Sequence, residues 1–129
     1  MTLNEYQQQA MTTCLPEAEN FTYMMLNLVG EVGEFAGKVA KAIRKGKAMV
    51  ERNEFYPFKP DTNNVIRASA MMIDEDFEEL QKEAGDILWQ LSGLCSVMGW
   101  QLEDIAQQNL DKLADRKSRQ VIDGSGDDR

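Results

Sequence analysis

Two pairs of carboxylates at helical spacing are the residues of this sequence that could do chemistry. Glu31 precedes Glu34 by three positions, and a second pair, Glu83 and Asp86, repeats the same spacing. In an α-helix this spacing places both acids of a pair on neighbouring positions of one face. Such carboxylates could hold a hard divalent cation or move protons. A single pair of this kind, however, more often marks a solvated helix edge.

The position of each pair relative to its own apolar stripe indicates more than an exposed edge. At about 100° per residue, Glu31 lies about 60° and Glu34 about 120° from Leu28, and the second pair has the same offsets from Leu80. If the two helices pack antiparallel through their stripes, a twofold rotation brings all four acids to one side. These acids would repel one another and raise their pKa values unless a cation neutralised them. All-oxygen ligation favours Mg²⁺ or Mn²⁺ over zinc.

The sequence contains no histidine. This excludes nucleophile systems built on Ser-His-Asp or Cys-His and the Glu-x-x-His type of di-iron site. With only two cysteines, Cys14 and Cys95, a structural zinc site with four nitrogen or sulfur ligands is also disfavoured. An enzyme with this composition must work through carboxylates, lysine, arginine or a hard metal ion.

Size and charge restrict the class of protein further. The 129 residues, 43% of them hydrophobic, are enough for one domain with a core. The net charge of −8 opposes binding to a nucleic acid polymer. The N-terminal residues have no basic region followed by an apolar run, and no stretch is apolar enough to span a bilayer. We therefore expect a cytoplasmic protein with no nucleic-acid or membrane partner and with reduced cysteines.

Apolar residues recur three and four positions apart, and no segment sustains the alternation of a strand, so we expect an all-α fold. The expected helices cover about residues 2–14, 19–46, 74–98 and 102–119. Thr2 and Glu5 are spaced as a capping box, Pro16 interrupts the first helix, and Gly46 and Gly99 end the second and third. The stripe of the second helix is Phe21, Met24, Met25, Leu28, Val32, Phe35, Val39 and Ile43. The third is expected to bury Phe77, Leu80, Ala84, Ile87, Leu91, Leu94 and Met98.

The connection from Lys47 to Ile73 is long for a compact domain. We expect a short helix near Asn64 to Met71 and a role as a lid or dimer contact. The glycine-rich, charged tail at 120–129 is by default a mobile terminus.

Three glycines and four polar residues accompany the acids. Gly30, Gly33 and Gly85 each cost about 1 kcal/mol in a helix relative to alanine, which suggests backbone kept clear for a ligand or for close helix packing. Lys38 lies on the helix edge of the first acid pair. Three further residues, Asn109, Lys112 and Arg116, share one face of the last helix. Lys112 and Arg116 would serve as phosphate ligands or as ordinary surface charge near a helix C-terminus.

These motifs resemble the MazG-like nucleoside triphosphate pyrophosphohydrolases of the all-α NTP pyrophosphatase group. The resemblance rests on Gly30-Glu31-Val32-Gly33-Glu34, on Glu83-Ala84-Gly85-Asp86, and on Asn109-x-x-Lys112-x-x-x-Arg116. It extends over roughly Leu26 to Arg119, within one MazG-like domain whose core is 19–119. The sequence departs from the family pattern Glu-Glu-x-x-Glu at its first glutamate, where Gly30 stands. The tail also looks like that of bacterial and phage members, which favours its ordering over the active site.

The resemblance implies a Mg²⁺-dependent hydrolase that cuts nucleoside triphosphates into the monophosphate and pyrophosphate. Its implied metal ligands are Glu31, Glu34, Glu83 and Asp86. Glu31 and Glu34 would be catalytic, with Glu34 as base or ligand. Implied substrate-binding residues are Lys38, Asn109, Lys112 and Arg116. The helices would form a bundle of the four-helix type, long and antiparallel, completed by homo-oligomerisation into a dimer or tetramer.

Two other classes of function remain open at this point. A non-catalytic helical interaction module would explain the apolar stripes and the charge, although not the matched offsets of the acids. A divalent-metal hydrolase of another phosphate ester would explain these features and the matched offsets. The preferred base is also open, since Trp89, Trp100 and the aromatic residues of the long connection could stack on a base or fill a core.

Overall fold

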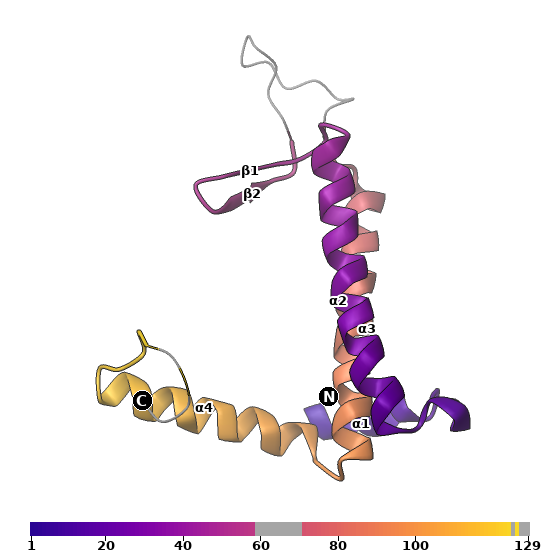
Figure 1. The fold of residues 1–129 in the computed structure, drawn as a ribbon, viewed down its shortest axis with the longest axis vertical. Coiled ribbons are helices and arrows are strands. Elements are labelled where there is room, and N and C mark those ends of the chain that lie inside the picture. Colours follow the sequence, from indigo (N-terminus) through magenta and orange to yellow (C-terminus); the bar gives the residue numbers. More distant parts are fainter. Residues whose placement is uncertain (59–70, 125, 127–129) are drawn as a thin grey trace. The chain divides into compact units, whose positions relative to one another are not determined.

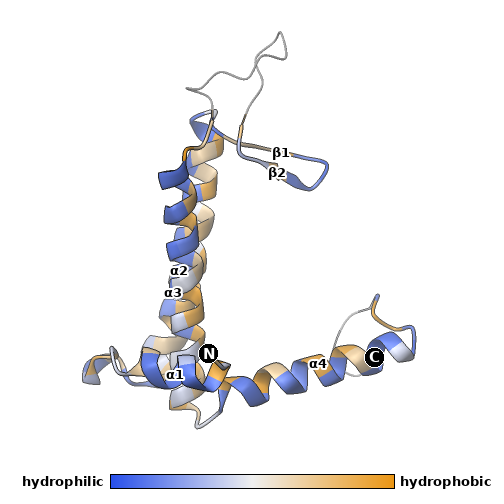
Figure 2. Ribbon diagram, turned by 180° about the vertical axis from the view of Figure 1, so that it is seen from behind, coloured by the Kyte–Doolittle hydropathy of each residue, from blue (hydrophilic) through white to orange (hydrophobic). Residues whose placement is uncertain are grey.

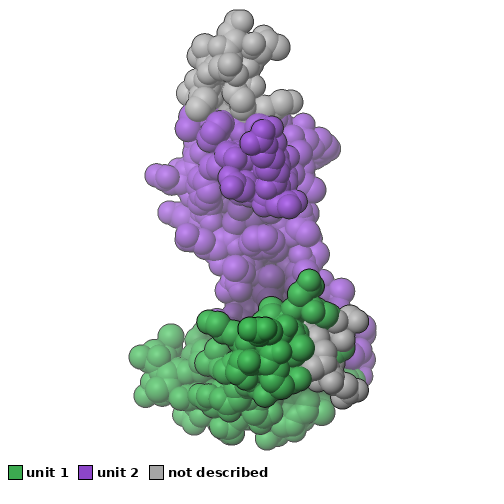
Figure 3. Space-filling model, turned by 90° about the vertical axis from the view of Figure 1, so that its left-hand side faces the viewer, with its two compact units in different colours: residues 1–21, 92–129 green, residues 22–91 purple. Residues whose placement is uncertain are grey.

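The computed structural model describes residues 1–58, 71–124 and 126 and is mostly helical (Figure 1). Its elements are α1 (Leu3–Met11), the 3₁₀-helix η1 (Pro16–Ala18), α2 (Phe21–Arg44), β1 (Met49–Glu51), β2 (Glu54–Tyr56), α3 (Asp74–Val97) and α4 (Leu102–Ser118). The chain divides into two compact units, one of residues 22–91 and one of residues 1–21 with 92–129, coloured separately in Figure 3. The expectation of a single domain stays a prediction.

In the unit of residues 22–91, α2 and α3 lie side by side in antiparallel orientation (Figure 1). Residues near the start of α2 contact residues near the end of α3, and residues at and after the end of α2 contact residues near the start of α3. The side-chain contacts that record this are Gln90 with Met24, Glu83 with Lys38, and Asp76 with Lys47. The predicted antiparallel pairing of the two acid-bearing helices is therefore observed.

Two glycines end the long helices as predicted. Gly46 and Gly99 both have φ of +72°, a left-handed conformation that glycine adopts without a Cβ penalty. After Gly46, the backbone N–H of Lys47 donates to the carbonyl of Ala42 at 2.9 Å, which closes a Schellman-type turn. This turn fixes the direction in which the chain leaves α2.

The mostly helical structure agrees with the predicted all-α class, but a short two-stranded antiparallel sheet that was not predicted follows α2. Met49–Glu51 pairs with Glu54–Tyr56 through a two-residue turn. The turn residues Arg52 and Asn53 have φ of 51° and 65°, as the tight turn of a hairpin requires. Strands of three residues are too short to show a recognisable alternation in sequence, which is why the prediction missed them.

The short helix expected near residues 64–71 falls almost entirely outside the described residues. Only Met71 is described there, and it forms an isolated antiparallel β-bridge with Phe58. At Met71 itself the expectation of helix is therefore wrong. A lid or dimer-contact role for the connection remains a prediction.

Helix α1 begins as predicted but ends earlier. The Thr2 hydroxyl accepts a hydrogen bond from the N–H of Glu5 at 3.1 Å, and the N–H of Thr2 donates to the Glu5 carboxylate, completing the capping box. The helix ends at Met11, whereas Cys14 was the predicted end. After Met11, the N–H groups of Thr12 and Thr13 each donate to the carbonyl three residues back at 3.1 Å, so a tighter turn replaces the next α-helical turn. The Thr12 hydroxyl also donates to the carbonyl of Gln9, at 2.6 Å.

In the other unit, a glutamine of α1 caps α4. Gln7 is buried, and its amide oxygen accepts from the N–H of Leu102 at 2.8 Å while its amide nitrogen donates to the carbonyl of Trp100 at 2.9 Å. Asn4 accepts from the N–H of Glu103 at 3.1 Å. The N-cap residue of α4 contributes no side-chain hydrogen bond, and these two side chains satisfy two of the free N–H groups that begin the helix.

The core is small, and much of the expected core face is exposed. Buried apolar residues are Met24, Ala48, Met72, Cys95 and Leu102. Four residues that α3 was expected to bury are exposed: Phe77, Ala84, Leu91 and Met98. On α2, Val32 and Ile43 of the predicted stripe are 50% and 41% exposed. Figure 2 shows hydrophobic residues along both helices. Two helices cover only the side that each presents to the other, so a stripe this broad stays partly open.

Both cysteines are free. Among the described residues, no helix is long and apolar enough to cross a membrane.

The cap from Gln7 yields a prediction about stability. Replacing Gln7 with leucine leaves the Leu102 N–H and the Trp100 carbonyl without their partner, so the free energy of unfolding should fall by about 1–3 kcal/mol. Chemical denaturation followed by circular dichroism measures this change. The matched control is Gln8→Leu, at the exposed neighbouring position, which should change stability by less than about 0.5 kcal/mol. Equal effects of the two variants would contradict the capping role.

Candidate metal centre

Three of the four predicted acids converge between α2 and α3. Oxygen atoms of Glu31, Glu83 and Asp86 all lie within 4.8 Å of one another. One acid comes from α2 and two come from α3, whereas the matched angular offsets predicted two from each helix. Two oxygens on one Mg²⁺ lie at most about 4.2 Å apart, so small side-chain rotations would let these three carboxylates bind a common divalent cation.

Glu83 is the buried member of this cluster, with 7% of its surface exposed. One carboxylate oxygen lies 2.9 Å from the Lys38 ammonium. The other oxygen, Oε2, is buried and has no hydrogen-bond partner among the described residues. A buried carboxylate oxygen without a partner is costly, and a divalent cation between Glu83 and the two other acids would provide the missing contact. The residues present therefore fit a cation.

Glu31 is held in place from the side by an amide network. Asn27 donates to the Glu31 carboxylate at 2.8 Å and to the side-chain oxygen of Gln90 at 3.2 Å. Burial, followed by the negative charges of Glu34 and the two α3 acids, raises the pKa of Glu31 above its usual range, and the Asn27 hydrogen bond offsets part of this rise. The direction of this pKa shift is the one expected of a carboxylate crowded by like charges.

Lys38 connects the cluster to a carboxylate of α3 outside it, Glu79. Its ammonium lies 2.7 Å from Glu79 and 2.9 Å from Glu83. Hydrogen bonds from Lys38 and Lys82 lower the pKa of Glu79 to about 2, and the two carboxylates raise the pKa of Lys38. Lys38 therefore stays protonated and supplies positive charge beside the buried oxygen of Glu83.

Glu34 lies outside the group of converging oxygens. It is exposed, and it forms no hydrogen bond or ion pair with another residue in the described parts of the chain. Its charge nevertheless acts on Glu31, one helical turn before it. The structure thus leaves Glu34 as a free carboxylate beside the cluster, and its roles as ligand and as base stay predictions.

The predicted substrate-binding residues of α4 belong to the other unit. Asn109 and Lys112 are exposed on that helix. Arg116 is only 5% exposed, and its guanidinium donates to the backbone carbonyl of Gly126 at 3.3 Å. Arg116 therefore contacts the C-terminal tail within its own unit. A role in binding phosphate stays a prediction for all three residues, as does the ordering of the tail over the active site.

The amides Asn27 and Gln90 and the carboxylate Glu79 are parts of the site that the sequence did not reveal. A signal was present, because Asn27 lies four residues before Glu31, and Gln90 lies four residues after Asp86. Residues four apart share a helix face, so amides at these positions could have been expected to support the acids.

Packing within this chain does not explain the glycines beside the acids. A Cβ added at Gly33 or Gly85 would meet no heavy atom within 4 Å, and one at Gly30 would meet only Asn27, at 3.6 Å. Of the two explanations raised from the sequence, close packing against the described part of the same chain is therefore wrong. Space for a ligand or for another chain remains.

Comparison with known proteins finds a matching family and a related phage protein. The sequence model of a family described as the MazG nucleotide pyrophosphohydrolase domain matches residues 19–121. A protein named Gene 37 protein, from Mycobacterium phage L5, is 36% identical over 111 residues, which cover 86% of this chain and 78% of the relative. No solved structure matches.

The cluster predicts a metal-dependent gain in stability. Mg²⁺ should raise the melting temperature, because a cation that binds only the folded state at a hundredfold excess over its Kd adds about 2.7 kcal/mol. Asp86→Asn should abolish this rise without lowering the stability of the metal-free protein, because it removes a like charge from the cluster. Glu78→Gln, the same charge change at an exposed site on α3, serves as the control in differential scanning fluorimetry. A rise that persists in Asp86→Asn would argue against this site.

Proposed function

Because this chain belongs to the MazG nucleotide pyrophosphohydrolase family, we propose that it hydrolyses nucleoside triphosphates, ribo or deoxy, to the monophosphate and pyrophosphate. The reaction uses Mg²⁺, with Mn²⁺ as an alternative. The P–O bond that joins the α- and β-phosphates through their bridging oxygen breaks. A water oxygen forms the new bond to phosphorus, and the bridging oxygen leaves on the other phosphate.

The observation that carries this proposal is the unpartnered buried oxygen of Glu83, whose carboxylate converges with those of Glu31 and Asp86. Glu31, Glu83 and Asp86 would hold the cation, and Glu34 is the fourth candidate ligand. When bound, the cation supplies positive charge for the phosphate oxygens and makes nearby water more acidic. An interaction module without catalysis would gain nothing from a buried, partly uncompensated carboxylate.

Two residues of α2 have roles that follow from their surroundings. Glu34 is exposed and unpaired among the described residues, so its carboxylate is available to accept the proton of the attacking water. Lys38 holds the Glu83 carboxylate through one ion pair and provides positive charge for the departing pyrophosphate. On the strength of the family motif, we also assign substrate contacts to Asn109, Lys112 and Arg116.

We further propose that the chain functions as a homodimer or homotetramer. Exposed apolar side chains on α2, among them Leu26, Val29 and Val32, form a row that a second copy could cover. The open space at Gly33 and Gly85 is compatible with another chain close to the backbone. The helices of the second copy would then complete a bundle of the four-helix type.

Turnover of a triphosphate panel tests the activity. With Mg²⁺ the wild type should release monophosphate and pyrophosphate, and a chelator should stop the reaction. Glu34→Gln should lower kcat by about 10² to 10⁴, because it removes the base while keeping the shape of the side chain. Its circular dichroism spectrum should be unchanged.

Glu78→Gln is again the control, with activity near that of the wild type. Products of diphosphate and phosphate, or no turnover of any triphosphate with either metal, would overturn the proposal. The second result would favour another phosphate ester as the substrate.

The oligomer has its own test. Val29→Lys places a charge in the exposed apolar row and should lower the molar mass measured by light scattering, because burying that charge in an interface is unfavourable. Gln9→Lys adds the same charge at an exposed position of α1, outside this row, and should leave the mass unchanged. A wild type with the mass of one chain would contradict the proposed oligomer.

A further inference from the structure

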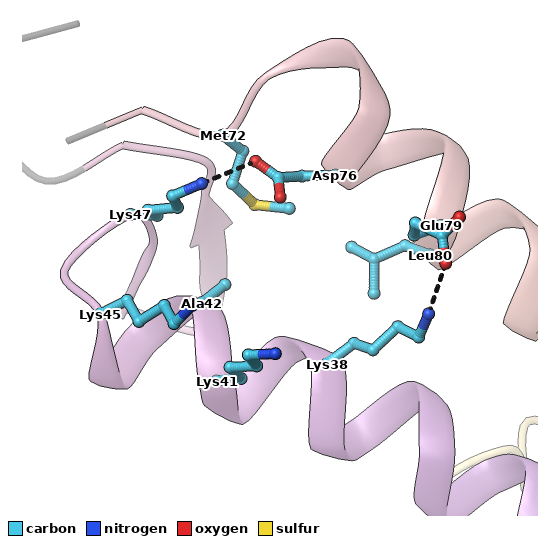
Figure 4. A pocket seen from close by; sticks show the side chains of 9 residues that line it. All are labelled: Lys38, Lys41, Ala42, Lys45, Lys47, Met72, Asp76, Glu79 and Leu80. Atoms are coloured by element: carbon cyan, nitrogen blue, oxygen red, sulfur yellow. Dashed lines mark hydrogen bonds and ion pairs between the residues drawn. The ribbon is translucent and has the colours of Figure 1, made fainter. Parts of the chain in front are cut away.

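A cavity of about 300 Å³ lies where α2 ends, within the unit of residues 22–91. Its polar lining consists of Lys38, Lys41, Lys45, Lys47, Asp76 and Glu79. Figure 4 shows the lysines on the α2 side of the cavity and the two acids on the facing α3 side.

Positive charge exceeds negative charge in this lining, although the whole chain carries −8. Two of the four lysines are neutralised, because Lys47 lies 3.3 Å from Asp76 and Lys38 lies 2.7 Å from Glu79. Lys41 and Lys45 have no ion pair with any described residue. The cavity therefore retains two ammonium groups whose charge is not matched by a direct contact.

Stabilisation of the helix dipole explains only part of this arrangement. Lysines at the C-terminal end of a helix are favourable there without any ligand, and this covers Lys41 in the last turn and Lys45 directly after it. Lys47 lies beyond the end of the helix, and the turn at Gly46 directs it back toward α3, where it meets Asp76. Lysines from both sides of the turn thus line the same cavity.

The position of the cavity relates it to the acid cluster. Lys38 belongs to both, since it lines the cavity and also lies 2.9 Å from Glu83. Glu34, Lys38, Lys41 and Lys45 follow one another at intervals of four, three and four residues, which keeps them on one helix face. At 1.5 Å per residue, Lys41 is about 10 Å along the helix from Glu34.

We propose that this lysine cavity binds the pyrophosphate end of the triphosphate and holds pyrophosphate after the bond is cut. The inference rests on the proposed function. Ammonium groups are effective phosphate ligands. The volume lies at the lower limit for ligand pockets, so it suits two phosphoryl groups better than a whole nucleotide. The base and sugar would lie outside the cavity.

Binding of inorganic pyrophosphate, measured by titration calorimetry in the presence of a chelator for divalent metals, tests the proposal without turnover. The double variant Lys41→Gln with Lys45→Gln should bind pyrophosphate at least about tenfold more weakly than the wild type, because two charge-assisted contacts are lost. The control is Arg44→Gln with Arg52→Gln, which removes the same charge from exposed residues outside the lining. It should bind as the wild type does.

Steady-state kinetics supplies the second reading. The lysine double variant should show a higher KM for the triphosphate and weaker inhibition by pyrophosphate, and the arginine control should show neither. Unchanged pyrophosphate binding in the lysine variant, equal weakening in the control, or unchanged KM and inhibition would each overturn the proposal.

The outcome is separable from that of the proposed function. If the wild type cuts no triphosphate, the proposed function fails, and the inference about its substrate fails with it. Calorimetry still shows in that case whether the cavity binds pyrophosphate as an anion. If triphosphates are cut and the lysine variant behaves as the wild type, the proposed function stands and only the cavity inference is lost.

Discussion

Burying the carboxylate of Glu83 between two helices removes it from water, and nearby charge must offset the free-energy cost of that transfer. Lys38 provides this charge for one oxygen, and the other oxygen has no partner among the described residues. A cation bound beside this oxygen would make the arrangement more favourable. Binding of a metal there would be coupled to the packing of α2 against α3, since both would depend on the same buried group.

The α2 edge that faces α3 changes its electrostatic character along its length. Near Glu31 the acids dominate, and beyond Lys38 the lysines dominate. A triphosphate that carries a cation could use both regions, because its metal-bound part would be attracted to the carboxylates and its terminal phosphates to the ammonium groups. Lys38 separates the two regions, and its ion pairs with α3 keep it in that position.

The parts of the fold that the sequence predicted are those set by long periodic patterns. The helices extend over many turns, and an angular offset from the apolar stripe is a property of the backbone, so the approach of Glu31 to Asp86 could be expected. Side-chain conformation is not set by spacing, which is why Glu34 lies outside the converging group. The hairpin strands were too short for a period to appear. Exposure of Leu91 was missed because one chain alone leaves part of its apolar face uncovered.

The cap that Gln7 places on α4 joins residues 95 positions apart. A helix that begins with a local cap can form as soon as its own residues are available, whereas the start of α4 depends on a segment from the other end of the chain. Closing so long a loop carries a larger entropic cost than local contacts and slows the step that depends on it. During synthesis on the ribosome, α1 would emerge early and remain without its partner until the region around Leu102 had followed.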